Sequence, residues 1–292
     1  MKILVGWSIW YGTRNVEEEL AKTLENGFDY LEISLAYPWI SNEENLVHII
    51  SVAKDLGFKI AFHGPWRDIR LGSPYREISE SSRAIVSKAI SSVVKYEPEY
   101  FNVHIISEEI TFSEKVKDKV LNEAKKSLNM LQKVSEDTGI TITVENNPQG
   151  FFSLPSHFNF IENYDSIYFC LDVGHAIISY FNIGEKNFDP ISVAKEWISV
   201  ISSDKILVTH LHNIIQSGKV LLDHYFFGYG IVNLSTLCRF LCRKTNVRYV
   251  LLELFHREEN IKHISERETV EIIRKNCVRP KVVADEFSSW NR

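Results

Sequence analysis

Eight short runs rich in β-branched and aromatic residues recur along this 292-residue chain, each followed by a longer segment with helical periodicity. The runs cover residues 2–5, 30–34, 59–63, 100–104, 140–145, 167–172, 205–210 and 249–253. This alternation is typical of a parallel sheet whose strands are connected by crossover helices. Because a (β/α)8 barrel commonly uses about 250 residues, the eight units predict an α/β fold with a single closed barrel and an active site at the carboxyl ends of the strands.

The segments between the runs supply the expected helices. They lie at residues 16–25, 43–56, 79–96, 113–138, 155–163, 189–202, 234–243 and 266–275. No low-complexity linker or change in composition divides the chain. We therefore expect one domain over residues 1–278, followed by a C-terminal tail over residues 279–292 that packs on the barrel or on a partner. The oligomeric state stays open.

The composition excludes several classes of protein. With 45% hydrophobic residues the chain can bury a large core, so it is not a disordered protein. A net charge of −5 provides no basic field, so a DNA partner would need a local patch or a metal site. No apolar run approaches the roughly 18 to 20 residues that span a bilayer. Four cysteines without CxxC spacing predict a reducing, cytoplasmic location, with buried thiols at Cys238 and Cys242.

Metal-type ligands close the last six predicted strands. They are His63, His104, Glu145, Asp172, His210 and Glu253. Any one of them alone is more often a structural residue, but a parallel barrel directs the carboxyl ends of all its strands to one rim, where six such side chains should converge. Imidazoles and carboxylates suit Zn²⁺ or Mn²⁺, and the absence of Cys from the set disfavours a closed structural zinc site. The sequence therefore predicts an open, catalytic metal centre.

Three further histidines lie just past these strands. In LDVGH, Gly174 is expected to let the chain turn after Asp172, so that His175 faces the rim. His212 follows His210 by two residues and is interpreted as more often solvated or supporting than ligating. His224 precedes a short GYG turn, which is far from a nucleotide-binding fingerprint, so nicotinamide and ATP chemistry are not expected.

Taken in order, these motifs resemble the xylose isomerase-like TIM barrels, a superfamily that includes sugar-phosphate isomerases and epimerases and the apurinic-site nuclease endonuclease IV. The resemblance covers nearly the whole chain, through FHGPW, FNVHI, TVENNP, LDVGH, VTHLHN, DHYFFGYG and VLLELF. It implies that one shared metal is held by Glu145, Asp172, His210 and Glu253. It also implies that His63 and His104, with Glu145 bridging, match the ligands of a second metal in the nuclease branch.

Departures from the nuclease pattern favour the isomerase side. His175 and His224 match two of the ligands of a third metal in that branch, or would contact substrate, but Leu222 stands at the position of the third ligand, an Asp. Asp223 is one residue out of register. The opening VGWSIWYG also lacks the His-containing start of the nucleases, and Asn213 stands where a supporting Asp is common. One to three divalent ions are therefore expected.

Two enzymatic functions remain open. In a sugar or sugar-phosphate isomerase or epimerase, Glu145 and Glu253 would move protons on opposite faces of an enediolate, while Arg67 and Lys219 are candidates for binding a substrate phosphate. Trp7, Trp10 and Trp66 would stack on a sugar or pack in the core. The alternative is an endonuclease IV-like, zinc-dependent phosphodiesterase acting on abasic DNA, in which two metal ions activate a hydroxide and stabilise the leaving oxygen. A non-enzymatic, sugar-binding barrel is a third interpretation, disfavoured by the intact ligand set.

Overall fold

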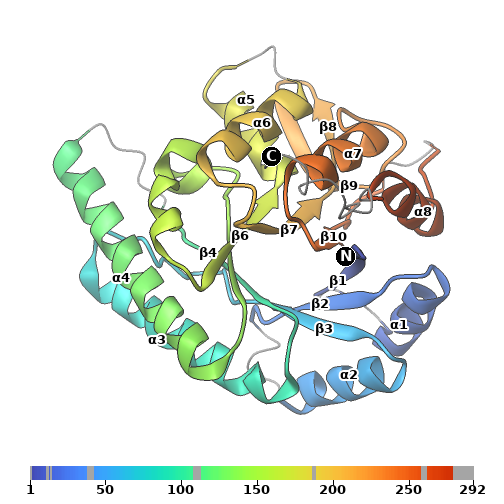
Figure 1. The fold of residues 1–292 in the computed structure, drawn as a ribbon, viewed down its shortest axis with the longest axis horizontal. Helices are drawn as coiled ribbons and strands as arrows, with labels where there is room; N and C mark the ends of the chain where they lie inside the picture. The colour runs from blue at the N-terminus through green and yellow to red at the C-terminus, as the bar shows by residue number, and fades with distance from the viewer. Residues whose placement is uncertain are drawn as a thin grey trace, which may run out of the picture.

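The computed structural model of the chain describes residues 2–10, 13, 15–37, 43–107, 113–185, 189–257 and 262–278. Eight parallel strands close a barrel in the order β1-β10-β7-β6-β5-β4-β3-β2 (Figure 1). The predicted single (β/α)8 barrel is confirmed. The barrel strands are β1 (Leu4–Ile9), β2 (Tyr30–Ser34), β3 (Lys59–His63), β4 (Phe101–His104), β5 (Ile142–Glu145), β6 (Ile167–Asp172), β7 (Ile206–Leu211) and β10 (Tyr249–Leu252).

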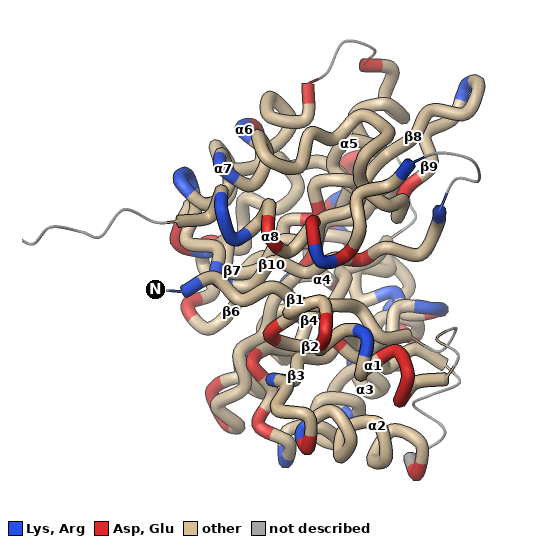
Figure 2. The backbone as a smooth tube through the Cα atoms, turned by 90° about the vertical axis from the view of Figure 1, so that its right-hand side faces the viewer, with Lys and Arg blue, Asp and Glu red and all other residues tan. Residues whose placement is uncertain are grey.

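Helices surround the barrel, as Figure 1 shows. Each long helix buries one apolar side against the strands, as α7 does with Leu237, Cys238 and Leu241. Acidic and basic residues lie interspersed along the outer elements in Figure 2, consistent with the small net charge. The helices are α1 (Val16–Glu25), α2 (Glu43–Asp55), α3 (Arg76–Val93), α4 (Glu114–Thr138), α5 (Val173–Asn182), α6 (Pro190–Val200), α7 (Leu234–Lys244) and α8 (Glu266–Asn276). None of the described helices combines the length and the apolar character required to cross a bilayer.

A layer of tyrosines fills the barrel at the amino-terminal end of its strands. The rings of Tyr30, Tyr100 and Tyr249 are buried, with centroids 5.1 to 6.0 Å apart. A Cβ on Gly6 would lie 2.2 Å from the Tyr30 ring, so only glycine fits at that position of β1. The prediction that the first strand spans residues 2–5 is wrong, because β1 continues through Gly6 to Ile9. Gly6 lies inside the strand and makes room for the Tyr30 ring.

Two helical predictions differ from the structure. Residues 155–163 form short 3-10 segments, η4 (Pro155–His157) and η5 (Asn159–Asn163), preceded by η3 (Phe151–Ser153). Phe158, Ile161 and Tyr164 are buried at intervals of three residues, which is the repeat of a 3-10 helix and is not easily distinguished in a sequence from the repeat of an α-helix. Helix α5 was not expected, because its first turns are buried on nearly all sides and lack the amphipathic pattern that marks a surface helix.

An antiparallel hairpin follows β7 and was also not expected. It consists of β8 (Asn213–Ser217) and β9 (Val220–Tyr225), joined by Gly218, with φ of +61°, and Lys219. A two-residue turn that begins with glycine is typical of tight hairpins, so the sequence Ser217-Gly218-Lys219 indicates this turn. In Figure 2 the hairpin lies at the end of the barrel opposite the N-terminus.

The cysteine prediction is half correct. Cys238 is a buried thiol, whereas Cys242 forms a disulfide with Cys277, 35 residues away, just after the end of α8. The prediction of a thiol at Cys242 is therefore wrong, because α7 and α8 pack side by side and bring two distant cysteines together. The predicted tail, residues 279–292, lies outside the described residues, and the division of the chain at residue 278 stays a prediction.

Candidate metal centre

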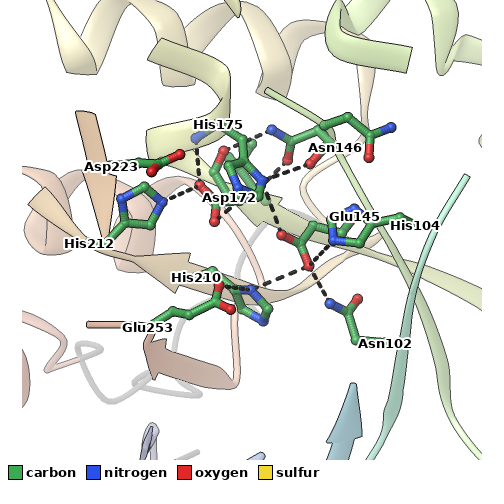
Figure 3. A network of polar contacts seen from close by, with 12 residues as sticks. Asn102, His104, Glu145, Asn146, Asp172, His175, His210, His212, Asp223 and Glu253 are labelled. Atoms are coloured by element: carbon green, nitrogen blue, oxygen red, sulfur yellow. Dashed lines mark hydrogen bonds and ion pairs between the residues drawn. The ribbon is translucent and has the colours of Figure 1, made fainter. Parts of the chain in front are cut away.

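The structure brings the six strand-end side chains together at the carboxyl end of the barrel. His63, His104, Glu145 and Asp172 end their strands, His210 is the next-to-last residue of β7, and Glu253 follows β10 directly. Their donor atoms form two groups, in each of which all donors lie within 4.8 Å of one another. One group contains Glu145, Asp172, His210 and Glu253, and the other contains His63, His104 and Glu145. Figure 3 shows Glu145 between imidazoles that come from different strands.

Glu145 belongs to both groups because its two oxygens face different neighbours. Oε2 lies 3.3 Å from Nδ1 of His210 and 3.5 Å from Nε2 of His63, while Oε1 lies 3.3 Å from Nδ1 of His175. The Asn102 amide also donates a hydrogen bond to Oε2. Burial raises the pKa of the Glu145 carboxyl, but the neighbouring imidazoles, His210 first, outweigh burial and hold this pKa well below its usual range. The carboxylate is therefore ionised.

Asp172 is held on both its backbone and its side chain. The Asn146 side chain accepts a hydrogen bond from the Asp172 amide at 2.9 Å and donates one to the Asp172 carbonyl at 2.8 Å. Asp172 is also the N-cap of α5, where Oδ1 accepts the amide of His175 at 2.7 Å. Oδ2 has no hydrogen-bond partner among the described residues.

His210 lies between carboxylates on both edges of its ring. Nδ1 faces Glu145 and is 3.4 Å from Oε2 of Glu253. On the other edge, Nε2 lies 3.4 Å from Oε2 of Glu32, which is buried in β2. Burial lowers the pKa of His210, but Cys170, Glu145 and Glu32 outweigh burial and raise this pKa well above its usual range. Sequence reasoning missed Glu32, although a charged residue in the middle of the apolar run YLEIS was a signal.

The donor set fits a divalent cation. Oδ2 of Asp172, Nδ1 of His210 and Nδ1 of His104 are buried, and no described residue offers them a hydrogen bond. Unpartnered buried polar atoms are costly unless they have another partner, such as a metal ion. Nδ1 of His63 contacts the Gly64 carbonyl oxygen at 2.8 Å and must carry a proton to bond with it, which leaves the lone pair of a neutral ring on Nε2. The residues present therefore suit Zn²⁺ or Mn²⁺.

A third group of donors contains His175, His212 and His224. Nδ1 of His224 pairs with Oδ1 of Asp223 at 3.1 Å, and burial, which lowers the pKa of His224, is outweighed by Asp223 and Glu253, which raise it to about 10. Leu222 is 37% exposed on β9, so the chain has an apolar side chain at the position where the nuclease branch has an Asp ligand. The carboxylate nearest this group in the sequence is instead paired with His224.

A cavity of about 700 Å³ at the carboxyl end of the barrel is lined by five of the donor residues, namely His63, His104, His175, His224 and Glu253. Its wall includes Trp10, Glu32, Trp66, Arg67, Arg70 and Phe255. The guanidinium of Arg67 lies 4.6 Å from the centre of the Trp66 ring, so two of the residues singled out in the sequence meet at the mouth. Trp7 is instead buried in the core, where its indole donates to Glu19. Lys219 is exposed on the hairpin turn and is not part of the cavity wall, so the structure does not bring it to the site.

Comparison with known proteins agrees with this architecture. A family model described as a xylose isomerase-like TIM barrel matches residues 20–275. An uncharacterized protein of Methanocaldococcus jannaschii is 26% identical over 239 residues, which cover 80% of this chain and 87% of that protein. Among solved structures, a D-tagatose 3-epimerase-like protein has a TM-score of 0.69 at 18% identity, covering 94% of this chain and 100% of its own. The D-allulose 3-epimerase of Methylomonas sp. has a TM-score of 0.68 at 14% identity, covering 94% and 97%. This chain belongs to the xylose isomerase-like TIM barrel family.

Proposed function

We propose that this protein is a divalent-metal-dependent isomerase or epimerase of a sugar or sugar phosphate, which acts by proton transfer through an enediolate. The observation that carries the proposal is the group of Glu145, Asp172, His210 and Glu253, whose donors lie within 4.8 Å of one another beside a cavity of about 700 Å³. Such a volume suits a small, largely enclosed ligand. The solved structures named above, whose fold the chain shares, include enzymes that epimerise sugars.

Those four residues would hold the metal, with Zn²⁺ or Mn²⁺ as the ions that suit them, and His63 and His104 would hold a second ion. When bound, the cation supplies positive charge beside the substrate's carbonyl and hydroxyl oxygens, which acidifies the adjacent C–H bond. The pKa values of both Glu145 and Glu253 are held well below their usual range, because nearby imidazoles outweigh the effect of burial. Both carboxylates are thus ionised, as a general base must be.

The chain's own carboxylates would move the proton. Glu145 lies on β5 and Glu253 follows β10, and the His210 ring lies within 3.4 Å of both carboxylates. We assign one of them to take the proton from the carbon next to the carbonyl, which leaves the electron pair in the enediolate. The other must first take up a proton from water, and it then returns that proton to the opposite face, which inverts that carbon, or to the neighbouring carbon, which moves the carbonyl.

The mouth of the cavity would bind the rest of the substrate. Trp10 and Trp66 line it and offer apolar ring faces to a sugar. Arg67 lies over Trp66 and is the residue we assign to a substrate phosphate. Lys219, on the exposed hairpin turn, has no part in this proposal.

Solvent exchange tests the proposal. Metal-loaded protein is incubated in deuterated water with a panel of free and phosphorylated ketoses and aldoses, and deuterium at the carbon next to the carbonyl is measured. We expect incorporation on at least one sugar and its loss in Glu253→Gln. The exposed Glu17→Gln, on α1, is the matched control and should retain full exchange. Exchange that persists unchanged in Glu253→Gln would refute the assigned role of this carboxylate.

A second candidate function is supported by the group of His63, His104 and Glu145, because two metals that share one carboxylate are typical of phosphodiester hydrolysis. It predicts metal-dependent cleavage of DNA that contains an abasic site, with activity that falls as salt is added. Cleavage by the parent protein that is lost in Glu145→Gln, together with no exchange on any sugar, would replace the isomerase proposal with this one.

A further inference from the structure

We infer that His212 is a positioning residue, whose imidazole donates a hydrogen bond from Nε2 to Oδ1 of Asp172 and so directs Oδ2 of that carboxylate to the metal. The inference rests on the proposed metal centre and adds to it a residue outside its ligand set. It also gives the β8–β9 hairpin a role, because the hairpin backbone decides which nitrogen of His212 carries the proton.

The tautomer of His212 follows from its two neighbours. The backbone amide of His224 donates to Nδ1 at 3.0 Å, so Nδ1 must present a lone pair. The Asn213 carbonyl oxygen lies farther from the same nitrogen, at 3.4 Å, where a hydrogen bond is weak. With Nδ1 accepting, the ring proton is on Nε2, which lies 3.1 Å from Oδ1 of Asp172.

The carboxylate of Asp172 accepts hydrogen bonds through only one of its two oxygens. Its Oδ1 accepts two donors, the amide of His175 at the start of α5 and Nε2 of His212. Its Oδ2 accepts none from any described residue. Two donors on one oxygen fix the rotation of a carboxylate, and supporting contacts of this kind to a metal ligand affect metal affinity.

The surroundings of His212 are shaped to hold its ring in place. A Cβ on Gly174 would lie 1.9 Å from Cε1 of His212, so the ring packs directly on the glycine backbone. The φ angle of Gly174 is not positive, so room for His212 explains this glycine, and the turn expected from the sequence does not, because α5 begins directly after Asp172. On its other face the ring stacks on His224 at 4.3 Å, and His224 stacks on Phe255 at 5.0 Å.

A different role would make His212 a ligand of its own ion, together with His175 and His224. The hydrogen bonds argue against this, since both nitrogens of His212 are already engaged. A ligating nitrogen would have to release either Asp172 or the hairpin amide. The two roles make opposite predictions for the number of ions bound, and ligation through Nε2 would also move the ring proton to Nδ1.

The first test is nitrogen NMR on metal-free, ¹⁵N-histidine-labelled full-length protein, with the His212 signals assigned by their loss in His212→Gln. We expect a protonated Nε2 and an unprotonated Nδ1 that is coupled to the His224 amide. A proton on Nδ1 would overturn the inference. Because no metal is added, this test still decides the matter if the parent protein binds no metal and the proposed function fails.

The second test measures zinc affinity by competition with a chelating indicator, together with zinc content. His212→Leu should weaken zinc binding about 10- to 100-fold without lowering the number of ions at saturation. His212→Gln, whose amide can donate from near the position of Nε2, should restore most of the affinity. The exposed His48→Leu on α2 is the matched control and should bind zinc as the parent does.

Two results would contradict the inference. If His212→Leu loses one whole ion and the remaining ions bind unchanged, His212 is a ligand and not a positioning residue. If His212→Leu is folded by circular dichroism and binds zinc like the parent, the hydrogen bond to Asp172 has no influence on the metal. Should His212→Leu fail to fold, Gly174→Ala, which displaces the ring and keeps every donor, takes its place with the same expectations.

Discussion

The Glu32 carboxylate lies 3.4 Å from Nε2 of His210, on the edge of the imidazole opposite the one that faces the other donors. A histidine that binds a metal through one nitrogen commonly donates the proton on the other to a carboxylate, which orients the ring and increases its basicity. Glu32 occupies that position for a metal bound at Nδ1. It therefore extends the site one strand beyond the six that the sequence pointed to.

We predict that Glu32→Gln weakens zinc binding about tenfold or more, because a neutral amide supports the His210 proton less well than a carboxylate does. The number of ions at saturation should not change. Competition with a chelating indicator measures the affinity, and Glu17→Gln on the outer surface controls for loss of one negative charge. Equal affinities in parent and Glu32→Gln would show that the contact does not support the metal.

The two donor groups should lose metal separately. We predict that His63→Ala lowers the zinc content by at most one equivalent, whereas Asp172→Ala removes the ion of the four-donor group. The reason is that only Glu145 belongs to both groups, so removal of His63 leaves the four-donor group intact. Elemental analysis after dialysis gives the counts. Complete loss of zinc in His63→Ala would contradict the division.

A buried ion pair outside the site predicts the acid sensitivity of the fold. Glu123 on α4 has an 8% exposed side chain and accepts hydrogen bonds from Ser79 at 2.6 Å, Arg83 at 3.0 Å and Lys126 at 2.5 Å. Burial raises the pKa of Glu123, but these donors, Lys126 first, outweigh burial and lower it to about 2. Because the folded pKa is depressed, the stabilisation is present above the unfolded value of about 4.5 and disappears as the pH falls toward about 2.

Glu123→Gln should therefore lower the free energy of unfolding at pH 7 by about 1–3 kcal/mol. The difference from the parent should shrink between pH 4.5 and pH 2, where the parent carboxylate becomes protonated. Denaturant titrations at several pH values provide the measurement. A difference that is constant over this window would mean that the charge of Glu123 contributes nothing. Glu136→Gln, an exposed residue on the same helix, is the control.

The disulfide predicts that reductant destabilises the protein. Cys242 and Cys277 close a loop of 35 residues, for which the loss of chain entropy in the unfolded state corresponds to about 4 kcal/mol. Dithiothreitol should lower the melting temperature of the parent. It should have no effect on a Cys242→Ser, Cys277→Ser double variant, which melts at the temperature of the reduced parent. A parent that melts identically with and without reductant would show that the bond does not stabilise the fold.

The sequence predicted the parts of the fold that depend on periodicity. Alternating strands and helices have different repeat lengths, so eight units and the strand-end positions of residues such as Glu145 and Asp172 could be read directly. The sequence pattern did not identify Glu32 as a site residue, because Glu32 lies inside a strand and a single carboxylate there produces no periodic pattern. The order of the pattern gives topology, but it does not show which side chain inside the barrel reaches the site.

Other misses depend on long-range contacts. The reason for Gly174 became visible only when the His212 ring was found on its backbone, 38 residues later in the chain. The partner of Cys242 follows from the packing of α7 on α8, which no local pattern specifies. The β8–β9 hairpin does not depend on long-range contacts, because the glycine before Lys219 is a local signal for a tight turn.

The tyrosine layer at the amino-terminal end of the strands determines from which end of the barrel a ligand can enter and leave. Tyr30, Tyr100 and Tyr249 fill the barrel interior below the metal-type donors, and the cavity above them is lined by residues of the opposite rim. The barrel interior is therefore closed at its amino-terminal end, and a ligand can enter or leave the cavity only from the carboxyl-terminal end. Under the proposed function, bound product would therefore compete with the next substrate molecule for the same opening, and the far end of a long substrate would extend into solvent.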